Sequence, residues 1–139
     1  MKFLHFGVKV DNIQEAMQSY TSLLGVTWNP VLEFDSPHQT MHGKPSSCKI
    51  FVTHGKTADG VEIEMIQLLD GAVPDQLVLG EQQGISHVAF TVDDLAAAKE
   101  KALAQGLTVV NEGQASKADW IFLLDKKLGG SLVQLVQMH

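Results

Sequence analysis

Two stretches of this sequence follow one pattern: LHFGVKVDNIQEAMQSYTSLLGVTW at residues 4–28 and SHVAFTVDDLAAAKEKALAQGLTVV at residues 86–110. Both place a histidine in an apolar run, followed by Val-Asp and then by small and apolar residues at matching places. The matching pairs are His5 and His87, Val10 and Val92, Asp11 and Asp93, Ile13 and Leu95, and Ala16 and Ala98. An internal repeat determines the whole architecture, so one structural unit is expected to occur twice.

A second pair of stretches supports the repeat. VEIEMIQL at residues 61–68 matches SLVQLVQM at residues 131–138, which places Glu64 on Gln134. Two matches in the same order favour tandem modules over chance. We therefore expect one domain over residues 1–139. Its expected parts are module one at about 1–71, a linker at about 72–83 and module two at about 84–139.

Each module is predicted to contain a strand, a helix and then further strands. Apolar side chains alternate along residues 3–10, as in a strand with one buried face. An apolar stripe at helical spacing follows, with Asp11 as the predicted cap and Gly25 as the predicted end. The second module repeats this order, with Asp93 or Asp94 as the cap.

Further strands and loops follow from local composition. Residues 48–54 and 118–125 are each predicted to form a strand that pairs with the next one along the chain. Residues 29–47 hold three of the four prolines and are predicted to be an irregular loop. The linker is predicted to carry a short helix after Pro74.

Composition excludes several classes of protein. The net charge is −6 and arginine is absent, which argues against a nucleic-acid-binding protein. No apolar run is long enough to span a membrane, so no membrane association is expected. Cys48 is the single cysteine and has no partner for an internal disulfide. Without a recognisable export signal, a cytoplasmic location is expected.

Four polar side chains are predicted to converge. Because the apolar strand faces must pack on the helices, His5 and His87 point to the opposite side of the sheet. If Glu64 and Gln134 do the same, two imidazoles, a carboxylate and an amide meet, which is a ligand set for a divalent metal. The alternative for either histidine alone is a hydrogen-bonded core residue, and their equivalence in the repeat weakens that alternative.

The matching pieces also resemble a known family. LHFGVKVDNIQEAMQSYTSLLGVTW, VEIEMIQLLDG, GISHVAFTVDDLAAA and GGSLVQLVQ resemble the vicinal oxygen chelate superfamily (glyoxalase, bleomycin resistance, dioxygenase) in order and spacing. The HGKP loop at residues 42–45 and the IEMIQLLDG strand at residues 63–71 are most similar to the branch of methylmalonyl-CoA epimerases and glyoxalases.

The resemblance implies an α+β fold, in which two tandem βαβββ modules form a cupped mixed sheet with helices on its convex side. It implies a divalent metal at His5, Glu64, His87 and Gln134, with Zn, Ni, Co or Mn favoured over Fe. It also implies a small-molecule substrate and a homodimer. His42 and Lys44 would border the cup, where they could bind substrate.

The resemblance further implies chemistry in which a metal-polarised carbonyl makes the adjacent C–H acidic and a carboxylate removes the proton. Glu64 is the carboxylate at a predicted ligand position, so it is ligand, base or both. Glyoxalases have a carboxylate where this chain has Gln134, and residues 41–52 lack the acid that epimerases use there. A metal-dependent lyase or isomerase is expected. The alternatives are a non-catalytic ligand-binding cup of the bleomycin-resistance type and an extradiol-type dioxygenase.

Two neighbouring polar residues receive secondary assignments. Glu62 lies on the same strand face as Glu64 and is predicted to be a rim residue that could support the site. His54 is predicted to open a hairpin turn and to be exposed to solvent.

Overall fold

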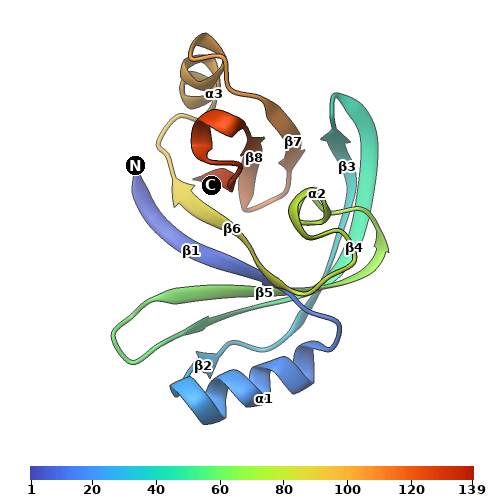
Figure 1. Cartoon of the computed structure of the whole chain (residues 1–139), viewed down its shortest axis with the longest axis vertical. Coiled ribbons are helices and arrows are strands. Elements are labelled where there is room, and N and C mark those ends of the chain that lie inside the picture. Colours follow the sequence, from blue (N-terminus) through green and yellow to red (C-terminus); the bar gives the residue numbers. More distant parts are fainter.

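The computed structural model describes residues 1–139 and consists mainly of strands, with two longer helices and a short one (Figure 1). None of the helices is long and apolar enough to cross a membrane. In chain order the elements are β1 (Lys2–Lys9), α1 (Ile13–Leu24), β2 (Thr27–Trp28), β3 (Leu32–Met41), β4 (Lys44–Lys56), β5 (Glu62–Gly71), α2 (Gln76–Leu79), β6 (Gly84–Thr91), α3 (Leu95–Ala104), β7 (Val109–Gln114), β8 (Ala118–Leu124), the 3₁₀ turn η1 (Lys126–Leu128) and β9 (Leu132–Met138).

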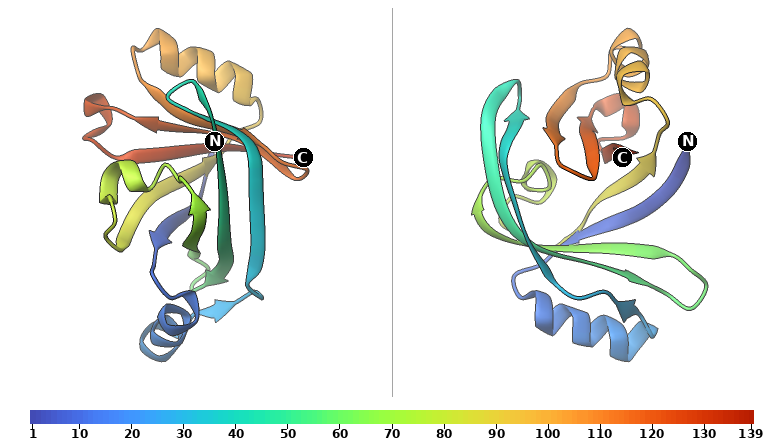
Figure 2. Two further views of the ribbon diagram at one scale, coloured as in Figure 1. Left: turned by 90° about the vertical axis from the view of Figure 1, so that its right-hand side faces the viewer. Right: turned by 180° about the vertical axis from the view of Figure 1, so that it is seen from behind.

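The strands form one mixed nine-stranded sheet in the order β2-β4-β3-β7-β8-β9-β6-β1-β5. An additional pairing of β4 with β5 closes all strands except β2 into a ring. The halves of the chain join twice, through the antiparallel pairs β1–β6 and β3–β7. Figure 2 shows the resulting cup, with α1 and α3 on its outside. The predicted α+β class and cupped mixed sheet are confirmed.

Strand register reproduces the repeat seen in the sequence. In the parallel pair β1–β5, Gly7 lies opposite Glu64. In the parallel pair β6–β9, Ala89 lies opposite Gln134. Gly7 is two residues after His5 and Ala89 is two residues after His87. Each histidine therefore has the same spatial relation to its partner strand, as the alignment predicts.

Helix ends show where local signals were ambiguous. The first helix is capped by Asn12, whose side chain accepts a hydrogen bond from the Glu15 N–H, and not by Asp11 as predicted. Asp94 caps α3 in the same way. Gly25 ends α1 with a φ of 65°, in the left-handed region that glycine adopts without steric cost.

Apolar packing between the helices and the outer face of the ring directs the polar residues inward. Val8, Val10 and Met65 are buried in a cluster that also includes Ile13 of α1. A second cluster packs beneath α3 and contains Ala102, Ile121 and Leu135. Because strand residues alternate between faces, burial of these outer faces turns the intervening residues toward the inside of the cup.

The proline-containing segment 29–47 corrects one prediction. Most of it forms β3 and the start of β4, which pair with each other over most of their length. Pro37 lies where the pairing register shifts, between Ser36 and Gln39. A bulge is one of the few places where a sheet tolerates the missing N–H of proline, so proline content alone was a misleading signal.

Candidate metal centre

Three side chains predicted as ligands meet inside the cup. His5 lies on β1, His87 on the adjacent β6 and Glu64 on β5. The His5 Nε2 atom is 3.2 Å from the His87 Nε2 atom, and 3.7 Å from Glu64 Oε2. The His87 Nε2 atom is 3.4 Å from Glu64 Oε1. One donor atom from each residue falls within 4.8 Å of the others, a spacing that could hold a metal ion.

The spacing of these donor atoms suits a divalent ion. Ligand atoms bound tetrahedrally to zinc at about 2.0–2.1 Å lie about 3.4 Å apart. Two imidazole nitrogens that face each other, as those of His5 and His87 do, need either an N–H proton on one of them or a metal ion between their lone pairs. Gln134 lines the same cavity, and its Oε1 atom is buried without a hydrogen-bond partner. An orphaned amide oxygen costs free energy unless it finds a ligand, so the donor set fits a metal.

Space for this cluster depends on Gly7. The residue lies opposite both His87 and Glu64 in the strand ladders. A Cβ atom at position 7 would overlap the imidazole ring of His87. Glycine is therefore required here for close approach, and a side chain at this position would displace His87 from the cluster.

Asp75 is the site residue that sequence reasoning missed. It is 2% exposed, and its Oδ2 atom lies 2.7 Å from His87 Nδ1. The Ser86 hydroxyl donates to the same oxygen. A hydrogen bond from Nδ1–H leaves the lone pair of Nε2 free to bind a metal and fixes the orientation of the ring. Asp75 thus fixes the orientation of the His87 ring beside His5 and Glu64.

The sequence around Asp75 carried only an ordinary helix-start signal. Its position after Pro74 and directly before α2 is typical of a residue that caps a helix. In the structure its side chain makes no capping hydrogen bond and points to His87 instead. The predicted short helix after Pro74 is present as α2.

Glu62 and His54 complete the surroundings. Glu62 Oε2 is 3.6 Å from His5 Nδ1, a buried nitrogen that has no hydrogen bond. His54 Nε2 is 2.9 Å from Glu64 Oε2. The residue lies within β4 and not in a turn as predicted, and its side chain is only partly exposed. The strand β4 continues to Lys56, so the period of two carries from Ile50 through Val52 to His54 and places all three on the cavity wall.

The same contacts alter the acidity of the cluster. Burial alone would lower the pKa of His87, but Asp75 and Glu64 outweigh it and raise this pKa to about 10. Burial would raise the pKa of Glu64, but hydrogen bonding from His54 and contact with His87 hold it well below its usual range. Burial lowers the pKa of His5. At neutral pH a cation is therefore favoured at the centre, and a metal would displace a proton from His87.

His42 and Lys44 lie apart from this cluster. His42 occupies the turn between β3 and β4 with a φ of 52°, and its backbone N–H donates to the carbonyl of Val110. Lys44 follows this turn at the start of β4. Both are exposed, and neither lines the cavity that contains His5, Glu64 and His87.

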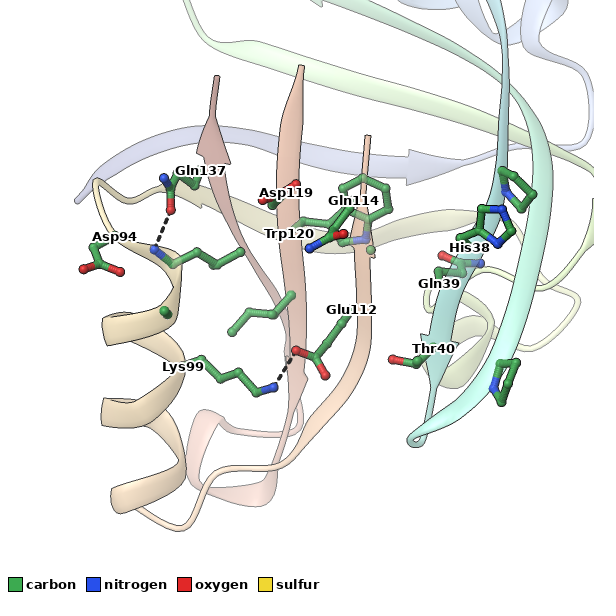
Figure 3. A pocket seen from close by; sticks show the side chains of 16 residues that line it. His38, Gln39, Thr40, Asp94, Lys99, Glu112, Gln114, Asp119, Trp120 and Gln137 are labelled. Atoms are coloured by element: carbon green, nitrogen blue, oxygen red, sulfur yellow. Dashed lines mark hydrogen bonds and ion pairs between the residues drawn. The ribbon is translucent and has the colours of Figure 1, made fainter. Parts of the chain in front are cut away.

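The cavity that contains the cluster has a volume of about 500 Å³ and is lined by 25 residues, of which 13 are hydrophobic. A larger hollow of about 700 Å³ lies outside the ring, between α3 and β3 (Figure 3). Two of its charged groups pair with each other, since Lys99 Nζ is 2.6 Å from Glu112 Oε1. The candidate metal ligands His5, Glu64 and His87 line the smaller inner cavity.

Comparison with known proteins agrees with the fold. Methylmalonyl-CoA epimerase from Mycobacterium tuberculosis is 21% identical with a TM-score of 0.75, over 98% of this chain and 87% of that one. A hypothetical protein from Bacillus halodurans C-125 is 17% identical with a TM-score of 0.70, over 98% and 93%. A Streptomyces coelicolor methylmalonyl-CoA epimerase variant in complex with 2-nitronate-propionyl-CoA is 18% identical with a TM-score of 0.62, over 99% and 96%.

No curated protein matches the sequence. The model of the family described as the Glyoxalase/Bleomycin resistance protein/Dioxygenase superfamily matches residues 4–123, which is most of the chain. The sheet order, the repeat-related histidines and this match agree with one another, and the chain belongs to that superfamily.

Proposed function

We propose that this protein is a metal-dependent lyase or isomerase that abstracts a proton next to a metal-polarised carbonyl of a small substrate. The observation that carries the proposal is the convergence of His5, His87 and Glu64 donor atoms within 4.8 Å in a cavity large enough for a small molecule. His5, His87, Glu64 and Gln134 would hold the ion. A divalent metal such as Zn, Ni, Co or Mn would supply Lewis acidity for the carbonyl oxygen.

Glu64 is assigned as the base that accepts the substrate proton. Its Oε2 atom accepts a hydrogen bond from His54 and its Oε1 atom faces the centre. In the proposed step, the C–H bond next to the carbonyl breaks, the proton moves to Glu64, and the electron pair enters an enolate. Glu64 then returns the proton to a neighbouring atom. Alternatively, Glu64 exchanges the proton with solvent and protonates the same carbon, and either route completes the cycle without an added reactant.

Proton transfer through one base suits this cavity better than transfer between two. The wall contributed by β4 presents Cys48, Ile50, Val52 and His54, with no carboxylate among them. Burial raises the pKa of the Cys48 thiol, so it is a poor base at neutral pH. Asp75 already accepts from His87 and Ser86. Glu64 is therefore the carboxylate best placed to act alone.

Proton exchange tests the proposal without knowledge of the natural substrate. Protein reconstituted separately with Zn, Ni, Co and Mn is incubated in D₂O with 2-hydroxyacetophenone and with hydroxyacetone, which carry vicinal oxygens next to acidic C–H bonds. Metal-dependent incorporation of deuterium, read by NMR, is expected. Tight metal binding without exchange of either compound would instead support the second candidate, a non-catalytic cup for small ligands, which the apolar lining favours.

Replacement of Asp75 by asparagine is expected to weaken metal binding about 10–100-fold, because an uncharged amide oxygen holds the Nδ1–H of His87 less strongly than the carboxylate does. The affinity is measured by competition with a chromophoric chelator. Long-range ¹H–¹⁵N spectra of the metal-free protein report the protonation of both His87 ring nitrogens. In the variant His87 should lose its proton at a lower pH than in the wild type, because the Asp75 carboxylate that raises its pKa is gone. Asp70→Asn, an exposed change on β5, is the matched control. Unchanged metal affinity and unchanged titration of His87 in Asp75→Asn would contradict the assigned role.

A further inference from the structure

The inner cavity differs sharply between its centre and its walls. Polar donors gather around His5, Glu64 and His87, whereas more than half of the lining residues are hydrophobic. Three aromatic side chains belong to the walls: Phe34 on β3, and Trp120 and Phe122 on β8. The Phe34 and Trp120 rings meet edge to face with centroids 6.2 Å apart.

The aromatic wall extends to the cluster of His5, Glu64 and His87. The Phe122 ring lies 5.3 Å from the His87 ring, centroid to centroid, at an interplanar angle of 88°. Register places Phe122 opposite Gln134, just as His54 lies opposite Glu64 in the other half of the ring. The repeat is therefore polar on one side of the centre, at His54, and apolar on the other, at Phe122.

Charge further limits what can enter. Among the residues that line the cavity, Lys117 is the only lysine, and it is exposed. The chain contains no arginine and carries a net charge of −6. Phosphate groups are usually held by arginine forks or clustered basic residues, and a negative protein repels a polyanion over a distance. The phosphates of coenzyme A find no matching surface at this cavity.

We infer that the substrate is a compact molecule with an uncharged apolar body of aromatic size and a pair of vicinal oxygens, and that it is not a coenzyme A thioester. The oxygens face the cluster of His5, Glu64 and His87, and the body packs against Phe34, Trp120 and Phe122. The part that concerns the oxygens rests on the proposed function. The part that concerns the body rests on the walls alone. The chain would thus act on a different substrate class from the coenzyme A esters named for its structural neighbours.

The first test compares two chelators on the Co-reconstituted protein. Benzohydroxamate and acetohydroxamate present the same pair of oxygens and differ in a phenyl or a methyl body. Titration followed by the Co(II) absorption spectrum is expected to show about 10–100-fold tighter binding of benzohydroxamate, because burial of the phenyl ring removes additional apolar area from water. Phe34→Leu should reduce that preference, because it weakens benzohydroxamate binding more than acetohydroxamate binding. Equal affinities of the two chelators, or competition by propionyl-CoA at the same concentrations, would overturn the inference.

A second test needs no metal. Saturation-transfer NMR of the metal-free protein with p-cresol is expected to show binding that Phe34→Leu weakens severalfold. Binding of p-cresol together with absence of metal binding would refute the proposed function and retain the apolar cavity. Metal and hydroxamate binding without any preference for the aromatic body would refute the inferred apolar substrate body and leave the proposed metal site standing. Thermal unfolding of Phe34→Leu confirms that the variant is folded, and Trp120→Phe serves as a second variant.

Discussion

Replacement of both His5 and His87 by alanine is expected to abolish specific metal binding, with a loss of affinity on the order of a thousandfold or more, since half of the proposed ligands disappear. Elemental analysis after reconstitution and dialysis measures the metal content. Wild-type protein should also melt at higher temperature when a binding metal is added, because a ligand bound only to the folded state stabilises it. The double variant should show no such shift.

The matched control replaces two histidines outside the cavity. His38 is exposed on β3, and His139 pairs at the surface with Asp119. Alanine at both positions keeps the number of remaining histidines equal to that of the test variant. Metal content and the metal-dependent shift in melting temperature should match those of the wild type. If the test variant retained the metal content and the metal-dependent shift in melting temperature, the assignment of His5 and His87 as ligands would be contradicted.

Glu64→Gln is expected to lower the rate of metal-dependent proton exchange by about 10²–10⁴-fold, which is the usual contribution of a positioned general base. Glutamine preserves the shape of the side chain and an oxygen that can bind metal, but an amide does not accept the substrate proton. The deuterium-exchange assay is run at saturating metal, so that weaker metal binding does not imitate a loss of chemistry. His54 remains in place to hydrogen-bond the amide oxygen.

Glu62→Gln provides the comparison. Glu62 lines the same cavity, and its Oε2 atom lies 3.6 Å from His5 Nδ1, whereas His5 Nε2 faces His87. Replacement of Glu62 should therefore change exchange by less than about tenfold. If Glu62→Gln reduced exchange more than Glu64→Gln at saturating metal, the base would be Glu62. A bell-shaped or sloping pH profile in the wild type that disappears in Glu64→Gln would further support Glu64.

Much of this architecture could be predicted because its signals are local and repeated. The alternation of apolar residues around Val8 and Val10 showed which strand face packs on α1, and hence that His5 faces inward. The repeat then assigned His87, Glu64 and Gln134 to the same cup. All four belong to regular strands, where a period of two relates position in the sequence to direction in space.

Other parts of the site depend on contacts that no local pattern encodes. Asp75 lies in a connecting segment, and only the path of the chain before β6 brings its carboxylate to His87. Gly7 is an ordinary glycine in a strand until the His87 ring is seen to occupy the space of its missing Cβ. His54 was misjudged because the end of β4 was placed too early.

The sequence alone therefore determined the strand faces, the repeat and the four candidate ligands, since these follow from short-range periodicity. Only the tertiary structure decided the supporting partners and the character of the cavity. Closure of the ring through β3–β7 and β4–β5 brings together residues that are far apart in the chain, so that the candidate ligands share one cavity with His54 and with the aromatic wall. The segment before β6 adds Asp75, which contacts His87. Side-chain contacts of that kind depend on how strands pair over long separations, which alternation within a single strand does not specify.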